Sequence, residues 1–370
     1  MERRAFLATT TAALAMPAWR AITSAAATER HLIYAATPGI RNYLSYGGIG
    51  VLVFDASDGY KLVKRIPTWP EPANGQEAEN VKGIAASAKT GRLYVSTTKR
   101  IGCIDLATEK MVWDQTYEGG CDRIALSPDG RTIWAPSFEG PHWTVIDAIS
   151  GKATAKVVLN SSAHNTIYSP TGARVYMAGL RSPLLAVADT RTNKVVNNVG
   201  PFGNSIRPFT INGSETLCFV NVNELLGFEV GDLKTGKKLH RVVIEGYEQG
   251  PVDRHGCPSH GVALTPDERE LWVADGHNKM IHVFDNTVMP PKQMTSLPVR
   301  DQPGWITFSI DGRFAYPSTG EVFDVKTHKV IATFTDEVGR RVGSEKLVEI
   351  VTDAGRPVRA GDQFGIGARK

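Results

Sequence analysis

Short apolar runs alternate with turn residues along most of this chain. Between Cys121 and Trp134, an apolar run at 124–126 is followed by the turn Ser-Pro-Asp-Gly at 127–130, and a second run begins at 132. Proline fixes φ in such a turn, and glycine is free to take a positive φ. The pattern therefore predicts two antiparallel strands joined by a tight turn.

The same pattern recurs at a nearly constant interval. Its turn positions are Ser87, Ser127, Ser169, Ile211, Thr265 and Ser309, at spacings of 40, 42, 42, 54 and 44 residues. A period of ~40 to 45 residues with four strands per unit is typical of a β-propeller, because a single four-stranded sheet buries both faces only when neighbouring sheets stack around an axis.

The two ends of the chain complete one further unit. Strand-like runs at 31–35, 50–55 and 61–66 lack a first strand, and the run at 346–351 supplies it. We therefore predict an all-β fold, a seven-bladed β-propeller of four-stranded antiparallel blades, closed by pairing of N-terminal and C-terminal strands. Such closure removes exposed sheet edges. Residues 28–370 form this single domain in the prediction.

These repeats resemble the YVTN-type β-propeller proteins and the seven-bladed lactonase-like propellers. The segments that carry the resemblance are the Ser-Pro-Asp-Gly-Arg turn at 127–131, Leu-Tyr-Val at 93–95, Leu-Trp-Val-Ala-Asp at 271–275, Val-Ile-Asp at 145–147 and Val-Phe-Asp at 283–285. The resemblance implies the fold of the whole mature chain. It implies no single activity, since it spans lactonases, cycloisomerases, lyases and proteins without known chemistry.

The N-terminal residues predict export. Arg3-Arg4-Ala5-Phe6-Leu7 precedes an apolar stretch to Met16, and small residues follow at 24–27. This order is typical of an export signal at residues 1–27, of the twin-arginine type or, alternatively, of the Sec type. Either places the mature protein in the periplasm or outside the cell. No apolar run beyond it approaches the ~20 residues of a membrane span.

The net charge bears on nucleic-acid binding, and the cysteine positions bear on metal binding and disulfides. The formal net charge is +4 and there is no Lys/Arg-rich run, so nucleic acid is not an expected partner. The cysteines Cys103, Cys121, Cys218 and Cys257 show no metal-binding spacing. We expect buried thiols at Cys103 and Cys218, and a disulfide between Cys121 and Cys257 remains open because only geometry decides it.

The propeller topology predicts where a site lies. If the first strand of each blade is innermost, the starts of these strands open on one face of the disc. Two columns of residues occupy these starts: Lys82, Asp122, His164, Ile206, His260 and Gly304, then Gly83, Arg123, Asn165, Arg207, Gly261 and Trp305. Lys346 joins the first column through the shared blade. Lys82, Arg123, His164, Arg207 and His260 predict a cationic ring at one mouth of the channel.

This ring predicts an anionic small molecule or acidic saccharide as ligand. Arginine and lysine would bind its carboxylate. His164 and His260 would transfer protons as general acid and base in a lyase, lactonase or cycloisomerase reaction. The substrate-binding candidates are Lys82, Arg123, Asn165, Arg207, Glu224, His277 and Trp305. Structural alternatives are hydrogen bonds of the histidines across the channel, pairing of Arg207 with Glu224 or Asp122, and sheet packing by Trp305.

Two other classes of function remain open. One is a non-catalytic propeller that binds a ligand or a partner protein at the same mouth. The other is a metal- or cofactor-bearing propeller, in which His255, His260 and His277, with Cys257, would hold a divalent metal ion. No haem-attachment or dinucleotide motif supports a particular cofactor. Two long connections, 67–80 and 248–259, are predicted to reach the mouth, where either could act as a lid.

Overall fold

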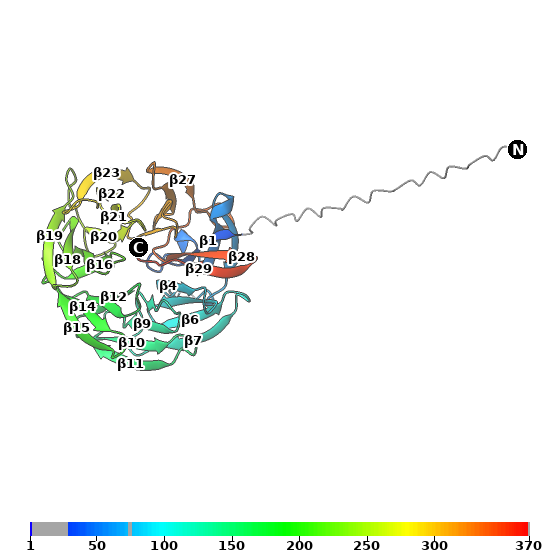
Figure 1. Ribbon diagram of the computed structural model, residues 1–370, viewed down its shortest axis with the longest axis horizontal. Helices are drawn as coiled ribbons and strands as arrows, with labels where there is room; N and C mark the ends of the chain where they lie inside the picture. Colours follow the sequence, from blue (N-terminus) through cyan, green and yellow to red (C-terminus); the bar gives the residue numbers. More distant parts are fainter. Residues whose placement is uncertain (2–28, 73–75, 369–370) are drawn as a thin grey trace.

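The computed structural model describes residue 1, residues 29–72 and residues 76–368. Seven antiparallel β-sheets surround a central channel as the blades of a propeller (Figure 1). The predicted fold is therefore confirmed. The export signal predicted at residues 1–27 falls, apart from Met1, outside the described residues and stays a prediction. No helix in the described part of the chain is long and apolar enough to cross a membrane.

Six of the blades have four strands in chain order, with the first strand of each next to the channel. Blade 2 contains β4 (Val81–Ser87), β5 (Arg92–Thr97), β6 (Arg100–Asp105) and β7 (Met111–Thr116). Blade 3 contains β8 (Ala125–Leu126), β9 (Thr132–Pro136), β10 (His142–Asp147) and β11 (Ala153–Val158). Blade 4 contains β12 (Ala163–Tyr168), β13 (Arg174–Gly179), β14 (Leu185–Asp189) and β15 (Lys194–Val199).

Blades 5 to 7 repeat this arrangement. Blade 5 contains β16 (Ile206–Ile211), β17 (Leu217–Val222), β18 (Gly227–Asp232) and β19 (Lys237–Val243). Blade 6 contains β20 (Ser259–Leu264), β21 (Glu270–Asp275), β22 (Met280–Asp285) and β23 (Lys292–Pro298). Blade 7 contains β24 (Ile306–Phe308), β25 (Phe314–Pro317), β26 (Glu321–Asp324) and β27 (Lys329–Thr333).

Blade 1 joins the two ends of the chain. It contains β1 (Arg30–Thr37), β2 (Gly50–Asp55), β3 (Lys61–Ile66), β28 (Leu347–Asp353) and β29 (Arg356–Ala360), with the short 3₁₀ helices η1 (Leu44–Tyr46) and η2 (Ala56–Asp58) between its strands. β1 pairs with β28 from Arg30–Thr352 to Ala35–Leu347, as the closure requires. The prediction of four strands is corrected here, because β29 adds a fifth next to β28. Ala354 and Gly355 both have positive φ, which turns the chain back in a hairpin.

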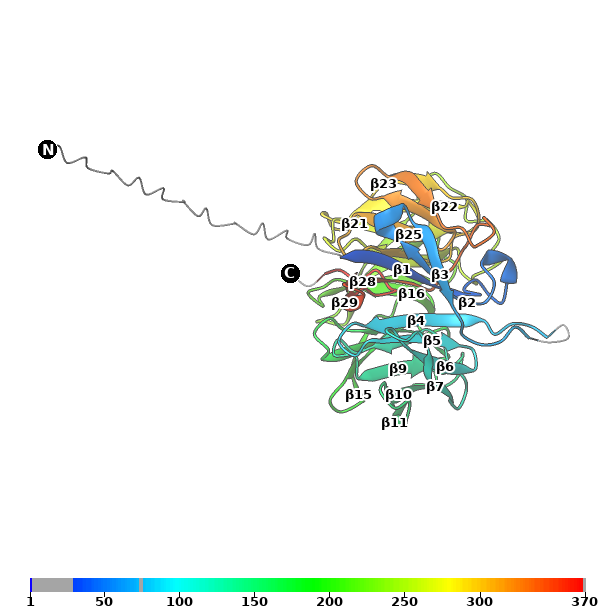
Figure 2. The same cartoon turned by 90° about the vertical axis from the view of Figure 1, so that its right-hand side faces the viewer.

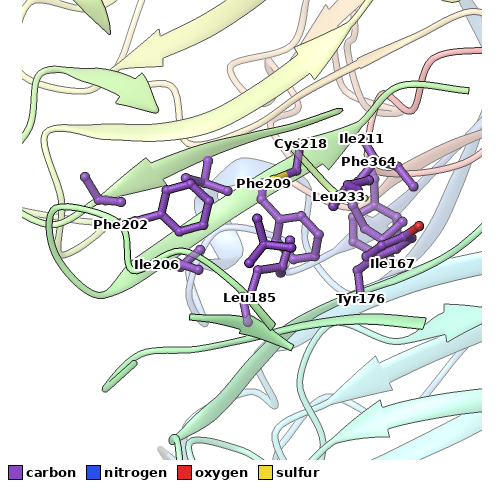
Figure 3. Packing of buried hydrophobic residues seen from close by; sticks show 14 of the residues in the cluster. Ile167, Tyr176, Leu185, Phe202, Ile206, Phe209, Ile211, Cys218, Leu233 and Phe364 are labelled. Carbon is purple, nitrogen blue, oxygen red and sulfur yellow. The ribbon is translucent and has the colours of Figure 1, made fainter. Parts of the chain in front are cut away.

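Apolar side chains fill the seams between neighbouring blades. Figure 3 shows the seam between blades 4 and 5, where Leu185 and Tyr176 pack against Phe209 and Ile206. Phe364, from the segment after β29, completes this cluster. Each fully buried side chain of this size contributes about 1.5–3 kcal/mol to folding. Because both faces of each sheet are covered in this way, stability depends on the closed ring.

The last segment of the chain enters the channel and contacts the innermost strands of several blades. The Gln363 side chain accepts a hydrogen bond from the Ile84 N–H at 3.2 Å and donates one to the Ile124 carbonyl at 3.0 Å. The Gly365 carbonyl accepts one from the Leu264 N–H at 2.8 Å. This end and the stretch between β3 and β4 lie at opposite faces of the disc (Figure 2). The C-terminal segment, residues 361–368, therefore blocks one end of the channel.

The cysteines are buried single thiols. Cys103, Cys121, Cys218 and Cys257 are all free and buried, so the disulfide considered for Cys121 and Cys257 is not formed. Burial raises the pKa of each thiol to about 12. A thiol with so high a pKa is a poor nucleophile and metal ligand.

Candidate functional site

Irregular pairing at the start of the innermost strands determines which side chains reach the channel. In β4, Val81 pairs with Thr97 and Gly83 with Ser96, so Lys82 is an extra residue. β12 has the same irregularity at His164. The register of β16 shifts at Arg207 and Pro208, and that of β20 at His260 and Gly261. A β-bulge redirects a side chain, and in these four blades it redirects a residue of the predicted ring.

The residues of the ring line one cavity of about 260 Å³ at the open end of the channel. They are Lys82, Arg123, His164, Arg207 and His260, together with Lys346. The cavity is completed by Arg41, Asn80, Phe138, Glu139, Leu180, Arg254, His255, Gly256 and Glu345. Five side chains besides Lys346 are cationic, namely Arg41, Lys82, Arg123, Arg207 and Arg254, and they face two carboxylates, Glu139 and Glu345, which makes the cavity electropositive.

Four further candidates lie elsewhere. Glu224 is exposed in the turn after β17 and accepts a hydrogen bond from Asn204 at 3.2 Å. His277 is exposed and borders a separate small pocket together with residues of the 248–259 segment. Asn165 and Trp305 are buried, with exposed fractions of 1% and 2%. None of the four borders the cavity.

Trp305 does not border the cavity but packs against Arg123, which does. The guanidinium of Arg123 stacks over its ring, with the Arg123 Cζ 3.3 Å from the ring centroid, and the indole N–H donates to the carbonyl of Gln363. Such stacking stabilises a desolvated guanidinium. Trp305 therefore connects the electropositive cavity to the C-terminal segment that closes the channel.

His164 and Asp122 form a hydrogen-bonded pair in the cavity wall. The Asp122 Oδ2 lies 2.7 Å from the His164 Nδ1, and its Oδ1 lies 3.4 Å from the Lys82 Nζ. Burial alone would raise the pKa of Asp122, but Lys82 and His164 outweigh burial and lower this pKa to about 2. Burial lowers the pKa of His164, against the opposing effect of Asp122. At neutral pH the pair is therefore a carboxylate and a neutral imidazole.

Glu345 joins three other side chains in the opposite wall. Its Oε2 lies 2.8 Å from the Lys346 Nζ and 3.2 Å from the Arg123 Nη2, and its Oε1 lies 3.2 Å from the His255 Nδ1. Burial opposes ionisation of Glu345, yet Lys346 and His255 hold its pKa well below the usual range. Burial lowers the pKa of Arg123 to about 10 and that of His255 to about 4.

His260 is the third histidine that borders the cavity, after His164 and His255. Its Nδ1 lies 2.8 Å from the Gly304 carbonyl, which can only accept, so this nitrogen carries the proton. Burial and the nearby His255 hold the pKa of His260 well below its usual value. The ring stacks on that of His255, with centroids 4.8 Å apart. This hydrogen bond joins neighbouring blades 6 and 7, and a hydrogen bond between blades is the structural alternative considered for His260 from the sequence.

The three metal candidates border one narrow pocket, of about 10 Å³, but do not form a metal centre. His255, His260 and His277 all line it. Within residues 29–72 and 76–368, no three or more His, Cys, Asp or Glu side chains are arranged to hold a metal ion. The stacked rings of His255 and His260 are close to parallel, at 26°, so their nitrogens do not converge on one point.

The 248–259 segment covers part of the mouth, as its sequence position predicts. Arg41 donates a hydrogen bond to the Arg254 carbonyl, and Arg207 donates one to the Gly256 carbonyl at 3.1 Å. The Arg254 guanidinium pairs with Asp301 at 3.3 Å. These contacts place His255 in the cavity.

The 67–80 segment contacts the outside of blade 2 instead. Trp69 donates to Asp114 in β7, and Glu79 pairs with Arg100 in β6. Among the described residues of this segment, only Asn80, at its end, reaches the cavity. The described part of this segment therefore does not cover the mouth.

The sequence interpretation missed Glu345, Arg41 and Arg254. Glu345 directly precedes Lys346, so the register of the shared blade would have indicated it. Arg41 and Arg254 belong to connections whose path the repeat pattern does not determine.

Comparison with known proteins gives no functional assignment. No family model and no curated protein matches the chain. One solved structure to which it is similar is a chain of Kuenenia stuttgartiensis hydrazine synthase, with 14% sequence identity and a TM-score of 0.47 over 70% of this chain and 98% of that chain. Similarity this low indicates no function. The resemblance to YVTN-type and lactonase-like propellers stays a prediction, whereas the seven-bladed fold is observed in the sheets themselves.

Proposed function

We propose that the protein binds a small carboxylate at the channel mouth and removes a proton from it with His164, in a lyase or isomerase reaction. One observation carries the proposal. Arg207 borders the cavity, and its hydrogen bonds go to neutral acceptors, the Asn223 Oδ1 at 2.5 Å and the Gly256 carbonyl. No carboxylate of the described chain pairs with it. A guanidinium oriented by neutral groups is available for an anion.

His164 has the geometry of a general base. Because Asp122 accepts from Nδ1, the proton of the neutral imidazole lies on Nδ1, and Nε2 carries the lone pair. Nε2 has no hydrogen-bond partner among the described residues, and the ring borders the cavity. Negative charge that develops beside a ligand carboxylate would face Lys82, Arg123 and Arg207, which stabilises an enolate-like transition state.

The first test is a thermal-shift screen of the mature protein at low salt. It would use pyruvate, malate, glucuronate and gluconolactone, since opening of a lactone also produces a carboxylate. A ligand that binds only the native state stabilises it, by about 2.7 kcal/mol when the ligand concentration is one hundred times its Kd, and therefore raises the melting temperature. We expect at least one carboxylate to raise the melting temperature and Arg207→Gln to abolish the shift.

The matched control is Arg191→Gln. Arg191 is exposed in the turn between β14 and β15 and does not border the cavity, so this variant should keep the full shift. Binding that survives in Arg207→Gln, or that disappears equally in both variants, would refute the site.

A further inference from the structure

Lys346 is a buried lysine in the wall of the cavity. It directly precedes β28, and only 3% of its side chain is exposed. Its Nζ donates to the Gly39 carbonyl at 2.9 Å and to the Glu345 Oε2 at 2.8 Å. No third acceptor for Nζ is present among the described residues. An ammonium group has three N–H bonds to satisfy, whereas a neutral amine has two and a lone pair.

The charge balance around Lys346 favours the neutral amine. The Glu345 oxygen that accepts from Lys346 also accepts from Arg123, at 3.2 Å. Arginine stays protonated in proteins, so Arg123 already neutralises this carboxylate. If Lys346 were also protonated, its buried ammonium group would lose its hydration without gaining a counter-ion of its own, which is unfavourable.

The pKa of Lys346 agrees with this balance. Burial lowers the pKa of Lys346 to about 7; Glu345 raises this pKa, and Arg123 and Lys82 lower it further. Near neutral pH, a large fraction of Lys346 is therefore unprotonated. A lysine desolvated beside other cationic groups is an activated nucleophile.

We propose that Lys346 is a nucleophilic lysine that forms an imine with the carbonyl group of a small oxo-carboxylate held in the cavity. The Nζ lone pair attacks the carbonyl carbon and forms the C–N bond. Both amine protons pass to the carbonyl oxygen, which leaves as water. The products are one imine and one water molecule, and nothing is oxidised or reduced.

This inference rests on the proposed carboxylate site and specifies its substrate class. The electropositive side chains would hold the carboxylate of the ligand, while its carbonyl faces Lys346. At ~30 Å³ per water molecule, a cavity of about 260 Å³ accommodates an oxo-acid of a few carbon atoms. An imine withdraws electrons from the neighbouring carbon, which would assist proton removal by His164.

The test is reductive trapping. The mature protein is incubated at pH 7 with pyruvate and cyanoborohydride, which reduces an imine to a stable carboxyethyl-lysine, and the labelled peptides are mapped by mass spectrometry. Because an ordinary lysine is almost fully protonated at this pH, we expect Lys346 to be labelled at least about tenfold more than exposed lysines. Excess malonate, which has no ketone, should protect Lys346.

Two variants complete the test. Lys346→Met should lose the dominant label, while Lys329→Met, which removes an exposed lysine of β27, should keep it. The wild-type map decides the result even if Lys346→Met folds poorly.

A melting-temperature shift with pyruvate but without label on Lys346 overturns the imine and leaves the carboxylate site intact. Uniform labelling of all lysines also overturns the imine, and absence of both shift and label for pyruvate contradicts both proposals for this compound.

Discussion

At the scale of single residues, two buried carboxylates organise the site. Asp122 orients His164 and faces Lys82, and Glu345 joins Lys346, Arg123 and His255. A buried carboxylate is stable only when cations and hydrogen bonds compensate for lost hydration. The walls of the cavity are therefore built around acids, although most of the ionisable side chains that border it are basic.

The charge of Asp122 should make the protein sensitive to acid. Its folded pKa of about 2 lies below the ordinary value of 3.8, so its contribution to stability is present above about pH 4 and is lost as the pH falls from 4 through 2. The shift corresponds to about 2 kcal/mol. Asp122→Asn should lower the free energy of unfolding at pH 7 by about this amount and flatten its pH dependence below pH 4, as measured by urea unfolding. An unchanged acid profile would contradict the charge network.

The protonation of His164 gives an independent check. Burial lowers its pKa and Asp122 partly restores it, so the imidazole should titrate below pH 6.5 in an NMR titration of labelled histidine. In Asp122→Asn the titration should move to still lower pH, because the carboxylate that favours the protonated form is gone. A shift to higher pH would show that Asp122 does not act on His164.

At the scale of secondary-structure elements, bulges and one inserted segment determine what enters the cavity. The bulge in β4 redirects Lys82 and that in β12 redirects His164. The 248–259 segment adds His255, and its path is fixed by contacts of Arg254 with Tyr46 and Asp301. A regular propeller would have neither the redirected side chains nor the cover over the mouth.

Release of this segment should be observable. Arg254→Gln removes the contacts with Tyr46 and Asp301, so we expect faster amide hydrogen exchange across 248–259 while exchange in the blade strands stays unchanged. The change in global stability should be within about 1 kcal/mol, because the contacts are partly exposed. Equal exchange in wild type and variant would mean that the arginines at 41 and 207 hold the segment without Arg254.

At the scale of the whole molecule, the C-terminus closes the structure in two ways. β28 completes blade 1 with β1, and residues 361–368 block the channel opposite the cavity. Phe364 packs in the seam between blades 4 and 5 (Figure 3). Gln363 bridges blades 2 and 3 through hydrogen bonds to Ile84 and Ile124. Ring closure and channel closure therefore depend on the same short part of the chain.

Removal of the chain from Gly361 onward should lower the melting temperature by several degrees. The deletion removes the buried Phe364 and the hydrogen bonds of Gln363 and Gly365. Truncation of one buried phenylalanine side chain lowers the free energy of unfolding by about 3–5 kcal/mol. Calorimetry of the truncated protein measures this effect. The control removes only residues 369–370 and should melt as the full chain does. Equal melting of both would show that the segment does not contribute to stability.

The blade number, the closure and the ring of basic residues can be predicted from the sequence, because each follows from a repeat whose period and strand order are properties of local sequence. Lys82, His164 and His260 occupy one repeat position, and Arg123 and Arg207 occupy the next. Both positions meet around the channel. Equivalence by repeat places a residue beside the channel but does not give the direction of its side chain, since Asn165 and Trp305 share a column with Arg207 and do not border the cavity.

The ion pairs of the site and the segment that covers it depend on long-range contacts in the folded chain. Glu345 meets Arg123 across 222 residues of sequence, and Gln363 reaches Ile84 across 279. Glu224 and His277 stand in connections outside the repeat, and their side chains lie away from the cavity. Such contacts depend on loop paths and on the compensation of buried charge, which are set by the folded surroundings. The repeat thus determines where the basic groups gather, and the folded surroundings determine which of them pair with a buried carboxylate.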